Sequence, residues 1–413
     1  MKIIIAPDSF KGSLSSQDVC ETVSRAARDA FSRARATGAV DGAVSGEAPE
    51  IVCIPIADGG EGTVESVLAA CGGRRVTAAA HDPLGRPMQA NYGIIQLPDG
   101  QGTGPFGTDP QNHAVAVLET AAASGLTLVN EQERNVLQSS TYGTGELLMD
   151  AVRRGYRTVY LGLGGSATND GGMGLAAALG ARFLDADGAK LRPAAASLQD
   201  VASVDLSGIA PDVSGAGADS PVRIVIMSDV QNPLLGPKGA TAVYGPQKGV
   251  TPDLVAPLDA AMADYADAVE RATGRTCRDV PGAGAAGGLG FGLLAFTDAE
   301  IRSGVDVVLD LAGFDAHLAA ADLVVTGEGR MDASSAYGKA AAGVARRCKA
   351  AGVPCVAIVG CTGDGADEMY RHSITEIVTT GQGLSHEEAM RTARPRCYDA
   401  AYEFFYKYFR QQT

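Results

Sequence analysis

The sequence predicts an α/β protein of two α/β domains, one of them Rossmann-like with a parallel sheet built from both ends of the chain. Three observations support this fold class. With 413 residues, the chain is too long for one hydrophobic core. Apolar runs typical of strands alternate with helical periodicity near both ends, which indicates a parallel sheet. Neither end has enough strands for a stable sheet of its own, so we expect the two ends to share one.

The N-terminal segment predicts a strand, a helix, a strand and a helix. The strand IIIAP precedes a helix over 16–35, and the strand IVCIPIA precedes a helix over 62–71. Ser15 and Asp18 fit a capping box for the first helix, although the acid is shorter than the usual glutamate. This order of elements is typical of a parallel sheet.

The C-terminal segment predicts the same alternation. It contains the strands DLVVTG, PCVAIVG and TEIVTT, a helix over 336–351 and a last helix from Ser385, and the run VDVVLD also resembles a strand. We assign 1–75 and 291–413 to the Rossmann-like domain and 76–290 to an inserted domain.

The inserted segment has irregular, glycine-rich connections, for which a mixed sheet is expected. FLDADGAKL predicts a hairpin-like turn with Asp187 and Gly188 at its tip.

The composition favours small molecules as partners. A formal net charge of −14 argues against nucleic acid or an anionic membrane, because both favour a basic surface. No run approaches the roughly 18 apolar residues of a membrane helix and the N-terminus has no signal-peptide core, so a cytoplasmic location is expected. The 8 cysteines show no CxxC pair or zinc spacing and are expected to be reduced. The 5 histidines are scattered, which gives a histidine metal site or a Ser-His-Asp triad little support.

The turn PDSFKGSLSS follows the first strand directly. The next helix begins there, so its free N–H groups face the sheet edge where doubly wound sheets bind ligands. Lys11 would add a positive charge, and Asp8 could hold a metal ion or a hydroxyl group. The alternative is a capped turn with a solvated lysine.

A second turn, ADGGEGT, follows the strand IVCIPIA. Its glycines permit a tight backbone, and Asp58 and Glu61 project at the same sheet edge as Asp8. Two acids there indicate Mg²⁺ binding or a general base. The alternative is a glycine turn whose acids favour the helix dipole.

The strongest local signal is GLGGSATNDGGMG, from Gly162. Its six glycines would let backbone amides converge on phosphate oxygens, and Ser166 and Thr168 supply further donors. It is not a Walker A loop, because GxxxxGK[ST] occurs nowhere in the chain. The alternative is close helix–sheet packing that requires glycine.

Two further glycine-rich segments follow. SDVQNPLLGPKGATAVYGPQKG places Asp229 at a strand end, and Lys238 and Lys248 in rigid turns that could clamp an anion; the alternative is a solvated loop. GAGAAGGLGFG contains GxGxxG, but Pro281 precedes it where a dinucleotide fold needs a strand, so a hinge or the start of a helix is expected.

The segment TGEGRMD carries Glu328, Arg330 and Asp332 to the edge of the shared sheet. The Arg330 guanidinium suits a carboxylate or phosphate because it can bind two oxygens at once; an ion pair with Glu328 or Asp332 is the alternative. Lys339 could serve the same anion. Together the clusters offer amides and cations for phosphates, acids for Mg²⁺ and an acid for an attacking hydroxyl, which favours a kinase.

The chain resembles bacterial glycerate kinases of the type 1 family from Met1 to about Gly360. The resemblance rests on motifs in the family's order: APDSFKGSLS, PIADGGEGT, TYGTGELL, GLGGSATNDGG, NPLLGPKGATAVYGPQKG, PGAGAAGGLG, VTGEGRMD and YGKA. It implies phosphorylation of D-glycerate with ATP and Mg²⁺, generally to 2-phosphoglycerate. It also implies a site in a cleft between a Rossmann-like domain and an inserted mixed α/β domain.

We expect the following division of roles. The nucleotide is assigned to Gly164, Gly165, Ser166, Thr168, Asn169, Lys238 and Lys248. The metal ion is assigned to Asp229 and Glu328, and the substrate to Asp8, Ser9, Lys11, Asp58, Arg330 and Asp332. The catalytic set is Lys11, Asp58, Asp170 and Arg330. In this hypothesis the cations hold the glycerate carboxylate or the phosphoryl group, Asp58 or Asp170 accepts the hydroxyl proton, and domain closure excludes water.

Several points stay open at the level of the sequence. Gln231 stands where the family usually has an acid, and Ser228 where it usually has a cysteine, so Gln231 is not assigned to the metal. The loops 36–50 and 98–113 look longer than is typical and are given no function. The alternatives are 3-phosphoglycerate as the product, a nucleotide-dependent hydroxy-acid oxidoreductase, and a small-acid binding protein. The oligomeric state is open, with a homodimer among the options.

Overall fold

The computed structural model describes residues 1–37, 47–97, 114–215, 221–336 and 339–411. The loop 98–113 and most of 36–50 lie outside these ranges.

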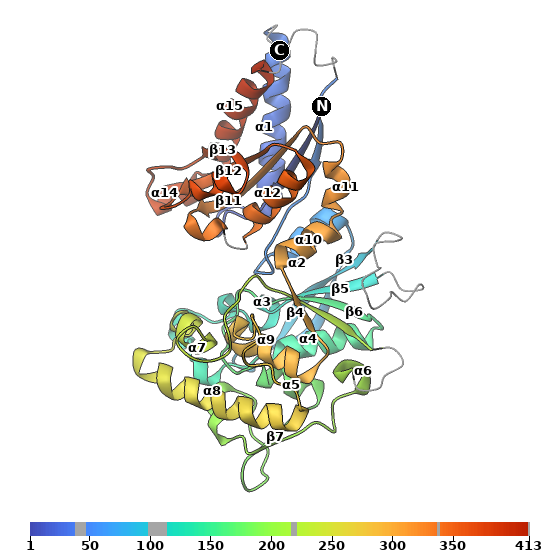
Figure 1. The fold of residues 1–413 in the computed structure, drawn as a ribbon, viewed down its shortest axis with the longest axis vertical. Helices are drawn as coiled ribbons and strands as arrows, with labels where there is room; N and C mark the ends of the chain where they lie inside the picture. The colour runs from blue at the N-terminus through green and yellow to red at the C-terminus, as the bar shows by residue number, and fades with distance from the viewer. Residues whose placement is uncertain (38–46, 98–113, 216–220, 337–338, 412–413) are drawn as a thin grey trace. The chain divides into compact units, whose positions relative to one another are not determined.

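The described residues group into two compact units. In Figure 1 the colour of the ribbon follows the residue number, so each unit can be found from its residue ranges. The terminal unit comprises Met1–Asp58, Glu65–Cys71 and Val305–Thr413; the inserted unit comprises Gly59–Val64 and Gly72–Gly304. The short segment Gly59–Val64 belongs with the inserted unit, although the predicted boundary lies later in the chain.

The terminal unit contains a parallel sheet that both chain ends build, as the sequence predicted. The strand order is β13-β12-β11-β1-β2, and every neighbouring pair is parallel. The strands are β1 (Lys2–Pro7), β2 (Glu50–Cys53), β11 (Leu323–Met331), β12 (Cys355–Thr362) and β13 (Ile374–Thr379). Strand β11 runs on through the TGEGRMD segment, so Glu328 and Arg330 lie in the strand itself rather than in a loop after it.

Two long helices cover one face of this sheet. Helices α1 (Ser16–Ala36) and α15 (Ala393–Gln411) lie side by side, and both contribute to one buried cluster with Ile5 of β1 and Ile358 of β12. Burial of each large apolar side chain contributes about 1.5–3 kcal/mol. The capping box is confirmed: the Ser15 hydroxyl accepts a hydrogen bond from the Asp18 backbone N–H at 3.0 Å, and the Asp18 carboxylate accepts one from the Ser15 N–H at 3.1 Å.

The prediction of a strand at VDVVLD is wrong. These residues form helix α10 (Gly304–Leu311). The run fits a helix because Asp306 and Asp310, four positions apart, fall on one face, where both accept hydrogen bonds from Arg347. The other helices of this part of the chain are α2 (Thr63–Cys71), α11 (Phe314–Leu318), α12 (Ala340–Ala351), α13 (Glu368–Arg371) and α14 (His386–Arg391).

The inserted unit contains the mixed sheet that was predicted. Its strand order is β10-β9-β6-β5-β4-β3, with antiparallel pairs at β3–β4 and β4–β5 and parallel pairs elsewhere. The strands are β3 (Arg74–His81), β4 (Pro87–Gln96), β5 (Ala114–Glu119), β6 (Thr158–Gly162), β9 (Arg223–Met227) and β10 (Glu300–Arg302).

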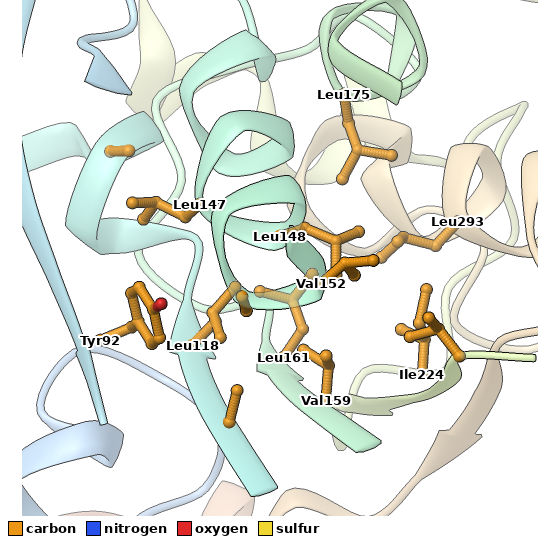
Figure 2. Close-up of a cluster of buried hydrophobic side chains, with 14 of the residues drawn as sticks. Tyr92, Leu118, Leu147, Leu148, Val152, Val159, Leu161, Leu175, Ile224 and Leu293 are labelled. Carbon is orange, nitrogen blue, oxygen red and sulfur yellow. The ribbon is translucent and has the colours of Figure 1, made fainter. Parts of the chain in front are cut away.

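The core of the inserted unit lies between this sheet and its helices. Figure 2 shows Leu147 and Leu148 of α4 (Tyr142–Arg153) in one cluster with Leu118 of β5 and Leu161 of β6. The other helices are α3 (Ala121–Ser124), α5 (Met173–Leu179), α6 (Pro211–Ser214), α7 (Ala240–Tyr244), α8 (Pro252–Thr273) and α9 (Ala285–Phe296).

The predicted hairpin-like turn at FLDADGAKL is confirmed, with an antiparallel bridge between Leu184 and Lys190. The Asp185 N–H donates to the Ala189 carbonyl at 3.0 Å, and the Leu191 N–H donates to the Phe183 carbonyl at 2.9 Å. Strand β7 (Arg182–Leu184) also pairs with the later strand β8 (Ser203–Asp205). The returning arm includes Pro193, which lacks the N–H that a longer ladder would need.

Within the described ranges, no helix is both long and apolar enough to cross a membrane.

Removal of the α1 cap gives a test of this local analysis. Ser15→Ala should lower the free energy of unfolding by about 1 kcal/mol, because it leaves a first-turn N–H of α1 without its acceptor. Gln17→Ala, in the same turn and exposed, is the control and should change it by a few tenths of a kcal/mol. Urea unfolding of both variants would measure the difference, and equal values would contradict the capping role.

Candidate active site

In the terminal unit, Asp8 is fixed at the carboxyl end of β1. Its backbone N–H donates to the Gly327 carbonyl of β11 at 2.9 Å, and its own carboxylate accepts a hydrogen bond from the Ser9 N–H at 2.6 Å. The chain on the other side of β1 is held by the Ile56 N–H, which donates to the Pro7 carbonyl at 2.9 Å. The backbone therefore fixes Asp8 between two neighbouring chain segments.

The environment of Asp8 raises its pKa from the ordinary 3.8 to about 7. Burial is the largest cause, and the negative charges of Asp58 and Glu328 add to it, while the hydrogen bond from Ser9 acts in the opposite direction. Burial and like charge both disfavour the ionised carboxylate. Asp8 can thus gain or lose a proton near neutral pH, a property typical of acids and bases at functional sites.

Glu328 is buried next to a lysine rather than exposed to solvent. Its Oε2 lies 3.7 Å from Nζ of Lys339, and its Oε1 has no hydrogen-bond partner among the residues that the structure describes. Burial is the main reason that the pKa of Glu328 is raised. The hydrogen bond from the Ser335 hydroxyl and the positive charge of Lys339 act in the opposite direction. The Lys339 charge therefore offsets part of the cost of burying this carboxylate.

Two cations of the terminal unit, Arg330 and Lys11, are exposed, in contrast to the buried Glu328. The Nε of Arg330 lies 3.5 Å from an Asp332 oxygen, yet the Arg330 side chain is 65% exposed, so the ion pair leaves much of the guanidinium open to a ligand. Asp332 accepts hydrogen bonds from the Ser334 backbone and hydroxyl at 2.9 and 2.6 Å, and the hydroxyl is the main cause that lowers its pKa. Lys11 is exposed on the turn between β1 and α1.

In the inserted unit, the glycine-rich loop connects β6 to α5 and packs closely on another glycine segment. The Gly164 N–H donates to the Gly59 carbonyl at 3.0 Å. A Cβ on Gly164 would lie 2.5 Å from the Gly60 Cα, so glycine is required there for close packing. Gly165 differs, because it is exposed and faces only side-chain carbons. The loop thus combines both predicted roles of glycine, namely close packing and an open backbone.

Asp170 lies fully inside this loop region. Its carboxylate accepts hydrogen bonds from the Thr141 N–H at 2.8 Å and the Thr141 hydroxyl at 2.9 Å, and from the N–H groups of Gly172 and Gly174, both at 3.1 Å. Burial raises its pKa, against the effect of these hydrogen bonds. The carboxylate serves to hold the loop and the start of α4 together.

Lys248, predicted to contact the nucleotide, is 3% exposed and lies beneath the loop. Its Nζ donates to the Ser166 hydroxyl at 2.8 Å and to the Thr168 carbonyl at 2.7 Å. Asn169 is also buried and donates through Nδ2 to the Thr241 hydroxyl at 3.0 Å.

The segment after β9 carries the remaining predicted residues. Asp229 follows the strand end and is partly buried, and Lys238 is exposed. Asn232 fixes the turn, since its Nδ2 donates to the Lys238 carbonyl at 2.7 Å and its Oδ1 accepts from the Tyr244 hydroxyl at 2.8 Å.

No three His, Cys, Asp or Glu side chains lie close enough to hold a metal ion in the part of the chain that the structure describes. Mg²⁺ in phosphate chemistry is usually held by one or two carboxylates together with phosphates and waters. Single carboxylates such as Asp229 and Glu328 are compatible with that mode of binding.

Known proteins resemble the chain over nearly its whole length. A profile described as the glycerate kinase family matches residues 3–407. The chain belongs to the glycerate kinase family.

Individual relatives agree with the profile. Glycerate kinase of Bacillus subtilis is 41% identical over 383 residues, covering 93% of this chain and 91% of that protein. Glycerate 2-kinase of Escherichia coli is 38% identical over 395 residues, covering 95% and 94%. A crystal structure from Salmonella typhimurium LT2, described as a candidate glycerate kinase 2, is 36% identical with a TM-score of 0.78, covering 98% of this chain and 97% of that one. Membership of the glycerate kinase family confirms the predicted resemblance and makes the chain a phosphotransferase.

The sequence did not single out two residues that support the site of this glycerate kinase family member. Thr141 binds Asp170, as described, and Glu119 of β5 accepts hydrogen bonds from the Gly62 N–H at 3.3 Å and from the Val64 N–H. Glu119 thereby holds the start of α2. Thr141 lies inside the family motif TYGTGELL, which was the only signal in its favour.

The segment GAGAAGGLG also supports the glycine-rich loop. The segment contains the start of α9, as the sequence predicted when it offered a hinge or the start of a helix. Three of its residues, Ala286, Gly287 and Gly288, have left-handed backbone angles. The Gly171 N–H donates to the Gly287 carbonyl at 3.0 Å, and a Cβ on Gly287 would lie 2.6 Å from the Asn169 Cα. The start of α9 therefore packs directly on the loop.

Alanine at Gly287 tests this contact. Gly287→Ala should lower the free energy of unfolding by about 3 kcal/mol or more, because it combines left-handed backbone strain with overpacking. Gly274→Ala is the matched control: φ is +70° there and +69° at Gly287, but no atom lies within 4 Å of the added Cβ. Its expected cost is about 1 kcal/mol. Chemical denaturation would measure both, and equal costs would show that the packing contact is unimportant.

Proposed function

We propose that this chain phosphorylates D-glycerate with ATP and releases 2-phosphoglycerate and ADP. The names of the relatives from Bacillus subtilis and Escherichia coli support glycerate as the substrate, and the second name supports the 2-hydroxyl as the acceptor. The observation that carries the proposal is the Asp8 carboxyl group, which accepts a hydrogen bond from the Ser9 N–H and has a pKa raised to about 7.

Asp8 is the residue that we assign as general base. A general base is most effective when its pKa lies near the working pH, and Asp8 meets that condition because burial and two neighbouring acids raise its pKa to about 7. Asp58 acts by its charge on Asp8 in this scheme. Asp170 is less suitable, since its carboxylate already accepts hydrogen bonds from Thr141, Gly172 and Gly174.

The exposed cations of the terminal unit are assigned to the substrate's negative charge. Arg330 can present two N–H groups to a carboxylate or phosphoryl oxygen, and its side chain is 65% exposed. Lys11, on the turn after Asp8, adds a second positive charge. Ser9 orients the Asp8 carboxylate, and Asp332 restrains Arg330.

The inserted unit is assigned to the nucleotide. Gly165 offers an exposed backbone, and Asn169 and Thr168 each have a buried side-chain oxygen with no hydrogen-bond partner among the described residues. Lys238 is exposed and can meet a phosphate from solvent. Asp229 is the carboxylate that we assign to Mg²⁺, which when bound neutralises phosphate charge.

The product assay tests the function directly. With D-glycerate and Mg-ATP, ADP release should depend on glycerate, and enolase added alone to the product should form phosphoenolpyruvate. Phosphoenolpyruvate that appears only after a mutase is added would identify 3-phosphoglycerate and overturn the assignment of the 2-hydroxyl. Absence of glycerate-dependent ADP would overturn the kinase proposal and favour a binding protein.

The role of Asp8 predicts opposite effects of one substitution on activity and on stability. Asp8→Asn should reduce kcat by about 10²–10⁴-fold, and kcat/KM of the unaltered chain should rise as the pH passes through about 7, because the base must be deprotonated. The folded pKa of about 7 lies above the ordinary 3.8, so the cost of Asp8 to stability grows as the pH rises from 3.8 to about 7 and is complete above about 7. Asp8→Asn should therefore raise Tm, and by more at pH 8 than at pH 5.

Asp187→Asn provides the control for this pair of measurements. Asp187 is exposed at the tip of a turn, so its neutralisation should alter neither kcat nor the pH dependence of Tm. If Asp8→Asn retained near-normal kcat across the pH range, Asp8 would not be the general base.

A further inference from the structure

We propose that Lys248 is a positioning residue that holds the glycine-rich loop from beneath and gains a proton when nucleotide phosphates bind to that loop. This inference rests on the proposed function, because it assumes that the loop receives the nucleotide.

The placement of Lys248 excludes simple attraction of phosphates from solvent. The residue ends a short 3₁₀ helix, Pro246–Lys248, and its side chain is 3% exposed. Its Nζ donates to the Ser166 hydroxyl at 2.8 Å and to the Thr168 carbonyl at 2.7 Å. The amine therefore contacts the two residues that flank Ala167, and it reaches the loop from the inside of the unit.

Backbone hydrogen bonds hold the same stretch of the loop. The Leu126 N–H donates to the Gly165 carbonyl at 2.8 Å, and the Ala167 N–H donates to the Ser124 carbonyl at 2.9 Å. Together with the two hydrogen bonds from Lys248, they restrain the segment from Gly165 to Thr168. Loss of the amine would leave the Thr168 carbonyl without its donor in a buried place, which destabilises this conformation of the loop.

The surroundings of Lys248 contain little compensating charge. Burial lowers its pKa from 10.5 to about 7, and Asp170 is the negative charge that opposes this shift. The amine also lines a narrow pocket with room for about one water molecule, where Arg134 contributes another positive group and the other lining side chains are uncharged. Near neutral pH the amine is therefore divided between its neutral and charged forms.

Phosphate binding would change that balance. An anion brought close to a buried amine favours the ammonium form and raises its pKa. At a pH slightly above 7, the free protein holds mostly neutral Lys248 and the complex holds mostly the ammonium, so binding takes up a proton. Well below the free pKa the amine is already charged, and the uptake disappears.

Calorimetric titration with ADP at pH 7.5 tests the proposal on the whole chain. Binding enthalpies measured in PIPES and in Tris give the number of protons taken up, because the two buffers differ in ionisation enthalpy. We expect Lys248→Met to take up about half a proton less per ADP than the unaltered chain and to bind ADP about 10-fold more weakly. The titration of ADP itself cancels in this difference.

Three further variants distinguish positioning from general damage. Lys248→Arg keeps a cation that does not lose its proton, so it should retain more ADP affinity than Lys248→Met but show the same missing proton uptake. Ser166→Ala removes one acceptor and leaves the amine, so it should raise KM for ATP several-fold while KM for glycerate stays unchanged. Lys190→Met, an exposed lysine on a turn, should match the unaltered chain in every measurement.

The outcomes separate this inference from the proposed function. If the unaltered chain and Ser166→Ala bind ADP, and proton uptake is equal in the unaltered chain and in Lys248→Arg, the Lys248 proposal fails while the kinase proposal stands. If the unaltered chain binds no ADP, both proposals fail. If Lys248→Met does not fold, the Lys248→Arg and Ser166→Ala measurements decide.

Discussion

Close approach of backbone segments is the constraint on which both units depend. In the inserted unit, Gly164 lies against Gly60, and the start of α9 at Gly287 lies against the glycine-rich loop. In the terminal unit, a Cβ on Gly360 of β12 would collide with the Gly329 carbonyl of β11. Protein interiors are packed as densely as organic crystals, so a methyl group added at such a place would clash with neighbouring atoms. The 53 glycines of the chain are in part the consequence of this packing.

Burial shifts the pKa values of an acid and a base in opposite directions in this protein. Burial raises the pKa of Asp8 to about 7 and lowers the pKa of Lys248 to about 7. In both cases the charged form is the one that loses hydration, so an acid and a base end with similar affinities for a proton. The ionised form of each group is therefore costly to hold in the folded chain, a cost that is common where function requires an unfavourable environment.

Much of the fold could be predicted because it depends on local pattern. The apolar runs at the two ends predicted a shared parallel sheet, and β1 indeed pairs with β11. The capping box at Ser15 was readable because its partners are three residues apart. The run VDVVLD was misleading because a short run rich in valine fits a strand as well as a helix. The hydrogen bonds of Asp306 and Asp310 with Arg347 depend on a residue far along the chain, so the sequence could not use them.

The properties of the site residues were less accessible from the sequence. A pKa depends on burial and on neighbouring charges. Folding sets both, because it brings together residues that are far apart in the chain, such as Asp8 and Glu328. For this reason the sequence could not show that the pKa of Asp8 is raised. It also could not show that Thr141 occupies the Asp170 carboxylate, or that a lysine in a glycine-proline turn would be 3% exposed.

The strand order of the terminal unit has a consequence for how the protein is made. Strand β1 pairs with β2 and β11, and β11 begins only at Leu323. At a synthesis rate of roughly 5–20 residues per second, β11 emerges from the ribosome tens of seconds after β2, and until then β1 lacks this partner strand. The inserted unit, which ends at Gly304, is synthesised during that time and is complete before β11 is made, so it is free to fold first. The terminal unit is therefore assembled after the inserted unit, and the edge of β1 stays open to wrong partners until β11 is made.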